Sequence, residues 1–226
     1  MATLYVVGTP IGNLDDITLR GLAILKSADL VLCEDTRVTK KLLDHYGIEV
    51  PTMSYHSQSG LAKLDKIIEN LEEGKNVALV SDAGTPTISD PGSVLISTVK
   101  KTLPQVQVVS IPGPSAVTAA LSIAGVPASD FLFLGFLPHK KGRETLFGEI
   151  KESKRTVVFY ESPHRIIKTL TSLDEHMGER TVHLARELTK IHEEVLSGKP
   201  EKLLQTLETL PEKARGEFVV VVDPVK

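Results

Sequence analysis

The sequence contains a single cysteine, Cys33, so no disulfide can form within the chain. A lone thiol is typical of a reducing compartment, and we expect a cytoplasmic protein. No apolar run approaches the length of a membrane span, and the N-terminal "MATLYVVGTPIG" lacks the basic start of a signal peptide. With 26 basic and 29 acidic residues, the formal charge is −3. This balance excludes a polybasic protein, although a local basic patch can still bind nucleic acid.

Motifs of several common enzyme classes are also missing. The phosphate-binding pattern G-x-x-x-x-G-K-[ST] and the nucleophile elbow G-x-S-x-G do not occur. The seven histidines are scattered, H-E-x-x-H is absent, and one cysteine cannot anchor a zinc site, so we expect no metal. "GTPIG" lacks the second glycine of the dinucleotide fingerprint, although Glu34 and Asp35 lie where a ribose-binding acid would be. A dinucleotide site is therefore only weakly indicated.

In the N-terminal part, short β-branched runs alternate with longer segments of helical period. Strands are expected at 4–8, 29–34, 76–81 and 105–111, and helices at 16–28, 37–47 and 61–74. Regular alternation of strands and helices predicts a mostly parallel sheet with helices on both faces.

After a strand-to-helix entry at 111–125 the pattern changes. Strands are expected at 130–138, 155–162, 181–187, 192–198 and 217–223, and helices at 142–153, 164–178 and 200–210. Little separates the third of these strands from the fourth, which suggests a hairpin and hence a mixed sheet. We place a domain boundary within 112–130 and predict two α/β domains, 1–115 and 116–226.

Residues that fix backbone shape collect directly after the strands of the first domain. The segments are "GTPIGN" (8–13), "CEDTR" (33–37), "SDAGTPTISDPG" (81–92) and "IPGPSA" (111–116). Each is most simply a turn when taken alone. In open α/β sheets, however, ligands bind beyond the carboxyl ends of the strands. Four such loops at one edge predict a neutral or cationic nucleoside-like ligand, held largely by backbone groups.

These blocks, together with "LYVVGTPIGNLDDITLRG", "FYESPHR" and "ARELTK", resemble the tetrapyrrole methylase superfamily over nearly the whole chain. "CEDTR", "SDAGTP" and "ESPHR" are similar to its branch of 16S rRNA methyltransferases. The resemblance implies a homodimer that binds S-adenosylmethionine between its two α/β domains. It also implies methylation of the ribose 2′-hydroxyl of a cytidine in the decoding region, in 16S rRNA or the 30S subunit. Members often carry a further helical segment, whereas this sequence ends at Lys226, as a short or a truncated member would.

The resemblance further implies a set of cofactor contacts. From the first domain and the boundary they are Pro10, Ile11, Asp82, Gly84, Thr85, Ile88, Ser115 and Ala116, and from the second domain Tyr160, Leu188 and Gly216. The superfamily often has a Gly-Asp-Pro turn where this sequence reads Gly84-Thr85-Pro86. Asp82 is therefore the candidate to supply the missing carboxylate.

Methyl transfer from a sulfonium is an in-line displacement, so positioning matters most, and a nearby base helps a ribose hydroxyl. We expect Asp35 or Glu161, each at the end of a strand, to orient or deprotonate that hydroxyl. Asp35 also suits the N-cap of the following helix, and the two roles can coexist. Glu161 likewise suits helix entry. His164 is more simply a helix-start residue, and Asp90 is most simply the N-cap of the next helix.

Binding of rRNA needs positive charge, despite the acidic total. We expect Arg37 and Arg165 to hold phosphates. The densest basic loop is "HKKGR" (139–143), in which Lys140, Lys141 and Arg143 are the candidates for rRNA contact. "KESKR" (151–155) is more simply solvated surface.

Two other functions remain open from the sequence. One is a methyltransferase of the same superfamily that acts on a tetrapyrrole or another small molecule. The low aromatic content of 4% and the "CEDTR" and "ESPHR" blocks speak against it. The other is a nucleotide-binding regulatory module without catalysis, against which the charged residues on the loops argue weakly.

Overall fold

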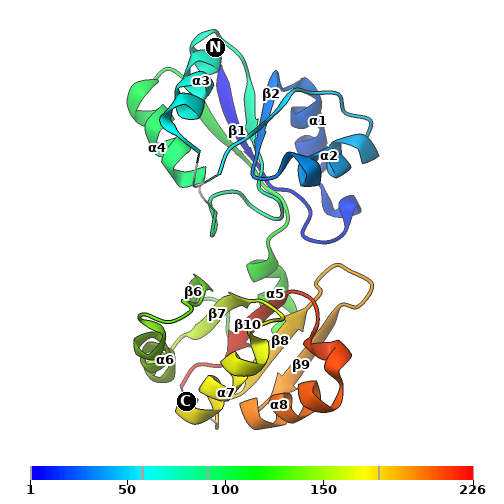
Figure 1. Ribbon diagram of the computed structural model, residues 1–226, viewed down its shortest axis with the longest axis vertical. Helices are drawn as coiled ribbons and strands as arrows, with labels where there is room; N and C mark the ends of the chain where they lie inside the picture. Colours follow the sequence, from blue (N-terminus) through cyan, green and yellow to red (C-terminus); the bar gives the residue numbers. More distant parts are fainter. Residues whose placement is uncertain (1, 57–58, 91, 178, 226) are drawn as a thin grey trace. The chain divides into compact units, whose positions relative to one another are not determined.

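The computed structural model describes residues 2–56, 59–90, 92–177 and 179–225. The chain divides into two compact units, Met1–Ser115 and Ala116–Lys226, each with its own sheet (Figure 1). The division falls within the range that the sequence predicts for a domain boundary. Among the described residues, no helix has both the length and the apolar character needed to cross a membrane.

The first unit is built on a parallel sheet in the order β3-β2-β4-β1-β5. Its strands are β1 (Thr3–Val7), β2 (Leu30–Cys33), β3 (Thr52–Ser54), β4 (Val77–Leu79) and β5 (Gln107–Ile111). Its helices are η1 (Leu14–Asp16), α1 (Leu19–Ser27), α2 (Thr36–His45), α3 (Leu61–Glu72) and α4 (Gly92–Thr102).

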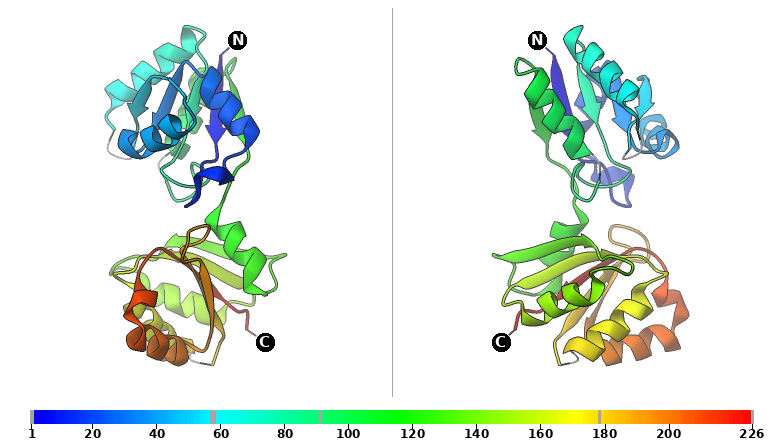
Figure 2. Two further views of the ribbon diagram at one scale, coloured as in Figure 1. Left: turned by 90° about the vertical axis from the view of Figure 1, so that its right-hand side faces the viewer. Right: turned by 60° about the vertical axis from the view of Figure 1, so that its left-hand side comes forward.

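Helices cover both faces of this sheet, as Figures 1 and 2 show. Leu4, Leu32 and Leu79 belong to the core under α3 and α4. Val31 and Ala78 belong to the core under α1 and α2. The strands β2 and β4 are apolar throughout, as expected for strands that are buried on both faces. The mostly parallel sheet predicted for this part of the chain is confirmed.

The second unit has a mixed sheet in the order β6-β7-β10-β8-β9, in which β6 and β7 are parallel and the other pairs antiparallel. Its strands are β6 (Phe131–Phe136), β7 (Thr156–Glu161), β8 (Val182–Arg186), β9 (Glu194–Gly198) and β10 (Phe218–Val222). Its helices are α5 (Ala116–Ala124), α6 (Arg143–Glu152), α7 (Ile166–Met177), α8 (Pro200–Thr209) and η2 (Pro211–Ala214).

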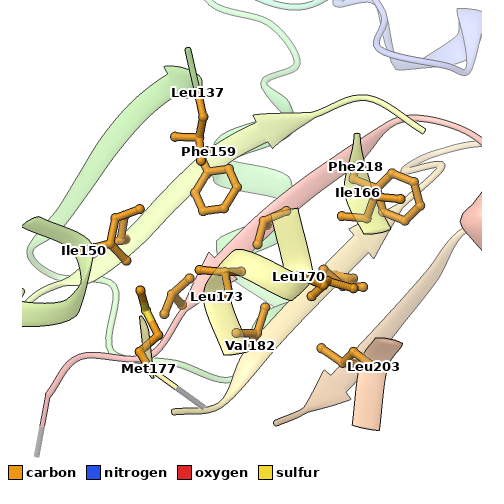
Figure 3. Close-up of a cluster of buried hydrophobic side chains, with 14 of the residues drawn as sticks. Leu137, Ile150, Phe159, Ile166, Leu170, Leu173, Met177, Val182, Leu203 and Phe218 are labelled. Atoms are coloured by element: carbon orange, nitrogen blue, oxygen red, sulfur yellow. The ribbon is translucent and has the colours of Figure 1, made fainter. Parts of the chain in front are cut away.

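The main core of the second unit lies between its sheet and α6, α7 and α8. Phe159, Val182 and Phe218 of the sheet pack there with Leu170 and Leu203 of the helices (Figure 3). Alternate residues of β10 and β8 point to the other face, where α5 packs. The mixed sheet is confirmed, and so is the β8–β9 hairpin. The short strand β3 was not predicted.

Candidate functional site

The four loops singled out in the sequence follow β1, β2, β4 and β5. These strands are neighbours in a parallel sheet, so their carboxyl ends meet at one edge of the first unit (Figure 2). The predicted gathering of the loops is confirmed, and hydrogen bonds join each loop to another.

The loops after β1 and β4 form a short antiparallel bridge. The Thr9 amide donates to the Gly84 carbonyl at 2.9 Å, and the Gly84 amide donates back to the Thr9 carbonyl at 3.1 Å. The Thr9 hydroxyl donates to the Ser81 carbonyl at 3.1 Å. Gly84 has a φ of +79°, a conformation in which an L side chain is strained. The bridge therefore fixes Gly84 against the end of β1.

The loops after β1 and β5 touch through two glycines. A Cβ on Gly8 would lie 2.8 Å from Gly113 Cα, and one on Gly113 would lie 2.7 Å from the Gly8 carbonyl oxygen. A larger residue at either place would push backbone apart. The Thr85 hydroxyl donates to the Pro114 carbonyl at 3.2 Å and so ties the β4 loop to the β5 loop. Three loops thereby form one connected surface.

The loop after β4 carries strained backbone just before α4. Thr87 and Ser89 have φ values of +76° and +71°. The carboxylate of Asp90 accepts hydrogen bonds from the Thr87 amide at 2.6 Å and from the first amide of α4 at 3.2 Å. Asp90 therefore caps α4, as predicted, and also holds the turn that presents Ile88, which is 47% exposed. Strain of this kind collects at functional sites.

Asp35 follows β2 and caps α2, which confirms the capping role expected from the sequence. Its carboxylate accepts from the Arg37 amide at 2.8 Å and pairs with the Arg37 guanidinium at 2.6 Å. These hydrogen bonds lower the pKa of Asp35 to about 2. The Asp35 amide in turn donates to the Asp82 carboxylate at 3.0 Å. Asp82 thus joins the β2 loop to the β4 loop.

Glu34, next to Asp35, is half-buried. Burial raises the pKa of Glu34, and repulsion from the carboxylates of Asp90 and Asp82 raises it further. The edge therefore concentrates negative charge beside backbone groups and the half-buried Ile11. Such a surface suits a ligand that carries positive charge.

The remaining predicted contacts of the first unit lie on the same loops. Pro10 is buried, Thr85 is half-buried and Asp82 is exposed. Ser115 is the last residue of the first unit, and Ala116 starts α5 in the second.

Glu161 of the second unit is buried, with 2% of its surface exposed. Its carboxylate accepts from the Thr169 hydroxyl at 2.6 Å and from the Ser162 amide at 2.8 Å, and it lies 3.3 Å from the Arg165 guanidinium. The side chain is enclosed by its own unit and links β7 to α7. This placement corrects the expectation that Glu161 acts on a ribose hydroxyl.

Arg143 is also an interior residue, 6% exposed, although it lies in the basic loop. Its guanidinium donates to the Thr169 hydroxyl at 2.8 Å and stacks over the Phe147 ring at 4.9 Å. It cannot reach a phosphate from there, so the expectation that Arg143 contacts rRNA is corrected. Lys140 and Lys141 are exposed.

The two other predicted phosphate ligands differ in exposure. The Arg37 side chain is 87% exposed beside Asp35. The Arg165 side chain is 17% exposed and donates to the Leu137 carbonyl at 2.6 Å. His164 is exposed in the turn before α7, which agrees with a helix-start role.

Three predicted cofactor residues belong to the second unit. Tyr160 lies on β7, Leu188 is buried after β8, and Gly216 precedes β10 with a φ of +90°. A Cβ on Gly216 would overlap the Glu187 side chain. Glu187 and Thr189 have φ values of +50° and +66°, so the loop after β8 is a second strained segment.

The model of the Tetrapyrrole (Corrin/Porphyrin) Methylases family matches residues 3–204. The chain belongs to the tetrapyrrole methylase family. The resemblance seen in its sequence blocks is therefore confirmed.

Similar proteins place this tetrapyrrole methylase within a branch of the family. The Ribosomal RNA small subunit methyltransferase I of Thermotoga maritima is 45% identical, with 98% of each chain covered. Proteins of the same name from Neisseria meningitidis serogroup B and Bacillus subtilis are 47% and 43% identical over 99% of this chain, and 77% and 75% of theirs. The expected likeness to the rRNA branch is confirmed.

Solved structures share the fold of this methylase. The cobalt precorrin-4 methyltransferase CbiF has a TM-score of 0.72 at 20% identity, covering 98% of this chain and 94% of its own. The methyltransferase CobJ has a TM-score of 0.71 at 21% identity, covering 100% and 95%. At such identity the likeness is one of fold alone.

Sequence reasoning did not single out three residues that hold the edge of this methylase together, namely Gly8, Thr9 and Gly113. Their signal was present, because "GTP" and "PGP" follow two strands of the same sheet. The sequence pattern identified the loops, but it did not show which backbone atoms of the loops would be in contact.

Proposed function

We propose that this chain transfers a methyl group from S-adenosylmethionine to the ribose 2′-hydroxyl of a cytidine in the decoding region of 16S rRNA, as a cytoplasmic homodimer. The observation that carries the proposal is 43–47% identity, over 97–99% of the chain, to relatives named Ribosomal RNA small subunit methyltransferase I. The 2′-hydroxyl and the cytidine rest on the resemblance of the "CEDTR", "SDAGTP" and "ESPHR" blocks to that branch.

The carboxyl edge of the first unit fits S-adenosylmethionine. Its sulfonium and ammonium charges suit an edge that carries Glu34, Asp35 and Asp82. Its adenosine needs close backbone approach, which Gly84 allows, and apolar contact, which Ile11 offers. The proposed contacts are Pro10, Ile11, Asp82, Gly84, Thr85, Ile88, Ser115 and Ala116, with Tyr160, Leu188 and Gly216 from the second unit.

When bound, the cofactor supplies a methyl group on a sulfonium that can be displaced in line. The chain contributes mainly position. Asp35 has a pKa of about 2 and is therefore a weak base, but its oxygens accept hydrogen bonds well. We assign it the orientation of the ribose hydroxyl. Asp82 supports it through the hydrogen bond from the Asp35 amide.

Exposed cations hold the rRNA backbone in this proposal. Lys140, Lys141 and Arg37 have side chains open to solvent. Arg165 contributes less to phosphate binding, because its guanidinium already pairs with Glu161 and donates to the Leu137 carbonyl. Sequence-independent contacts of this kind supply much of the affinity for nucleic acid.

Methyl-labelled S-adenosylmethionine, incubated with the protein and undermethylated 30S subunits or naked 16S rRNA, tests this function. We expect label in 16S rRNA, in a dinucleotide that resists alkaline hydrolysis because its 2′-oxygen is methylated. Label only in a tetrapyrrole would support the small-molecule rival, and binding without transfer would support a regulatory module. Gly84→Val serves as a negative control, because Gly84 has a φ of +79°.

A further inference from the structure

The edge strand β6 contains one residue more than its partner β7 over the same stretch. Phe133 pairs with Val158, whereas Phe136 pairs with Tyr160, so three steps on β6 match two on β7. Gly135 lies within the irregularity with a φ of +61°. This is a β-bulge, a device that re-aims side chains near functional sites.

The bulge puts two aromatic rings on one face of the sheet. Residues 133 and 136 would point to opposite faces of a regular strand. Here the Phe133 and Phe136 rings both contact Tyr160, with centroids at 5.1 Å and 5.3 Å. Burial raises the pKa of Tyr160. Phe133 and Tyr160 are half-buried, but Phe136 is 59% exposed. The half-buried Phe133 and Tyr160 rings therefore form one cluster with the Phe136 ring, which is open to solvent.

The exposed ring is followed within five residues by basic side chains. His139, Lys140 and Lys141 are all exposed and lie three to five residues after Phe136. The Arg165 guanidinium lies 3.4 Å from the His139 ring nitrogen, so it belongs to the same corner. The carboxylate of Glu144, three residues after Lys141, lies 3.0 Å from the His176 ring nitrogen and so already has a partner. The surface therefore combines one flat aromatic face with positive charge.

This combination fits single-stranded RNA better than an apolar protein partner. Unpaired bases stack on aromatic rings, while the phosphates between them need Lys or Arg. A second copy of the chain would bring the same lysines to the interface, where like charges repel.

We propose that the Phe136 ring is a stacking platform for an unpaired base of the rRNA substrate, with Lys140 and Lys141 on the neighbouring phosphates. The inference rests on the proposed function and deepens it. Phe133 and Tyr160 act as positioning residues that hold Phe136 through the bulge at Gly135.

Substitution of Phe136 tests the platform in the methylation assay with 30S subunits. Phe136→Ala should raise the KM for 30S subunits on the order of 10-fold or more. The dissociation constant of S-adenosylmethionine should change by a smaller factor, measured separately because Tyr160, which touches Phe136, is also a proposed cofactor contact. Phe136→Trp should retain the wild-type KM, and Phe136→Leu should resemble Phe136→Ala because it is apolar but not aromatic. Leu210→Ala is the matched control, since Leu210 is a 39% exposed apolar residue of the same unit.

A direct measurement of stacking is available because the chain contains no tryptophan. Phe136→Trp introduces a single indole, whose fluorescence should be quenched when oligocytidylate is added. Leu210→Trp, with its indole elsewhere on the unit, should show little quenching. Sedimentation of Phe136→Ala should give the wild-type oligomeric state.

The outcomes separate the inference from the function on which it rests. If the wild-type protein labels no rRNA, the proposed function fails. If it labels rRNA and Phe136→Ala or Phe136→Leu keeps the wild-type KM, only the platform is overturned. A change in oligomeric state with unchanged RNA affinity would overturn it too, because the ring would then contact a second copy. Quenching by a tetrapyrrole but not by RNA would have the same consequence.

Discussion

In the second unit, the hydroxyl of Thr169 donates a hydrogen bond of 2.6 Å to the carboxylate of Glu161, and both side chains are buried. The same hydroxyl accepts a bond of 2.8 Å from Arg143. One interior network therefore joins α6, α7 and β7. A buried carboxylate is tolerable only while such partners remain in place.

Removal of the Glu161 carboxylate should therefore lower the stability of the folded protein, and not abolish methyl transfer directly. Glu161→Ala removes the carboxylate that pairs with Arg165 and accepts from the Thr169 hydroxyl, and we expect a loss of about 3–5 kcal/mol in the free energy of unfolding, measured in urea. Asp130→Ala is the matched control, because Asp130 is 69% exposed in an ion pair with Arg155 and should cost less than about 1 kcal/mol. Wild-type stability combined with lost methylation would instead restore a catalytic role for Glu161.

The contact between Gly8 and Gly113 should not tolerate a methyl group. Gly8→Ala would place a Cβ 2.8 Å from Gly113 Cα, and we expect about 1–3 kcal/mol of destabilisation together with weaker cofactor binding. Gly148→Ala is the matched control, because Gly148 lies in the middle of α6 and nothing lies within 4 Å of a Cβ added there. It should stabilise the protein by about 0.5–1 kcal/mol. Equal effects of the two substitutions would contradict the close approach.

The pairing of Asp35 with Arg37 predicts a titration at low pH. The folded-state pKa of Asp35 is about 2, below its ordinary value of 3.8. Because the pKa is depressed, the stabilising contribution is complete above about pH 4 and is lost as the pH falls towards 2. Carboxyl NMR of the folded protein should give the midpoint directly. Arg37→Gln should move it upwards, and a wild-type midpoint near 4 would contradict the pairing.

The sequence predicted the parallel sheet and its loops because those features depend on local pattern. The apolar run at 76–81 reads as a strand buried on both faces, and "SDAGTPTISDPG" is too rich in Gly and Pro for anything but a shaped loop. The strand β3 was missed because it has only three residues, Thr52–Ser54, at the sheet edge, which are too few to display a clear period.

What the sequence could not give were the partners of polar residues. Arg143 stands in a run of basic residues and looks exposed, but Thr169 and Phe147 come from α7 and α6 and enclose it. Glu161 looks like a strand-end catalytic acid in the sequence, but its carboxylate is occupied by the Thr169 hydroxyl of α7. Likewise, the isolated Gly135 in "FLFLGFLP" is compatible with a bulge, but which side chains the bulge re-aims is seen only once β7 is placed beside it. These facts depend on long-range contacts, which local pattern does not encode.

The Asp90 carboxylate should control the strained turn in the loop after β4, which we propose to bind the cofactor. Asp90→Ala removes the acceptor for the Thr87 amide, and we expect the turn at Thr87 and Ser89 to relax. The dissociation constant of S-adenosylmethionine should then rise on the order of 10-fold, measured by calorimetry. Asp90→Asn is the control, because its amide oxygen still accepts both hydrogen bonds. If Asp90→Asn binds S-adenosylmethionine as weakly as Asp90→Ala does, then the charge of Asp90, and not its hydrogen bonds to the turn, determines the affinity.

Lys140 and Lys141 should determine part of the salt dependence of rRNA binding. Each phosphate contact to single-stranded RNA contributes about 0.7 to the slope of log affinity against log salt concentration. Lys140→Gln with Lys141→Gln should therefore lower the slope by about 1.4 and weaken binding at low salt. The control is Lys151→Gln with Lys154→Gln, two lysines of the neighbouring basic segment that we expect to be only solvated. Filter binding between low and moderate salt gives both slopes. If the slopes of the two double variants agree, the loop at 139–143 is ordinary charged surface, and the RNA must be held by other cations such as Arg37.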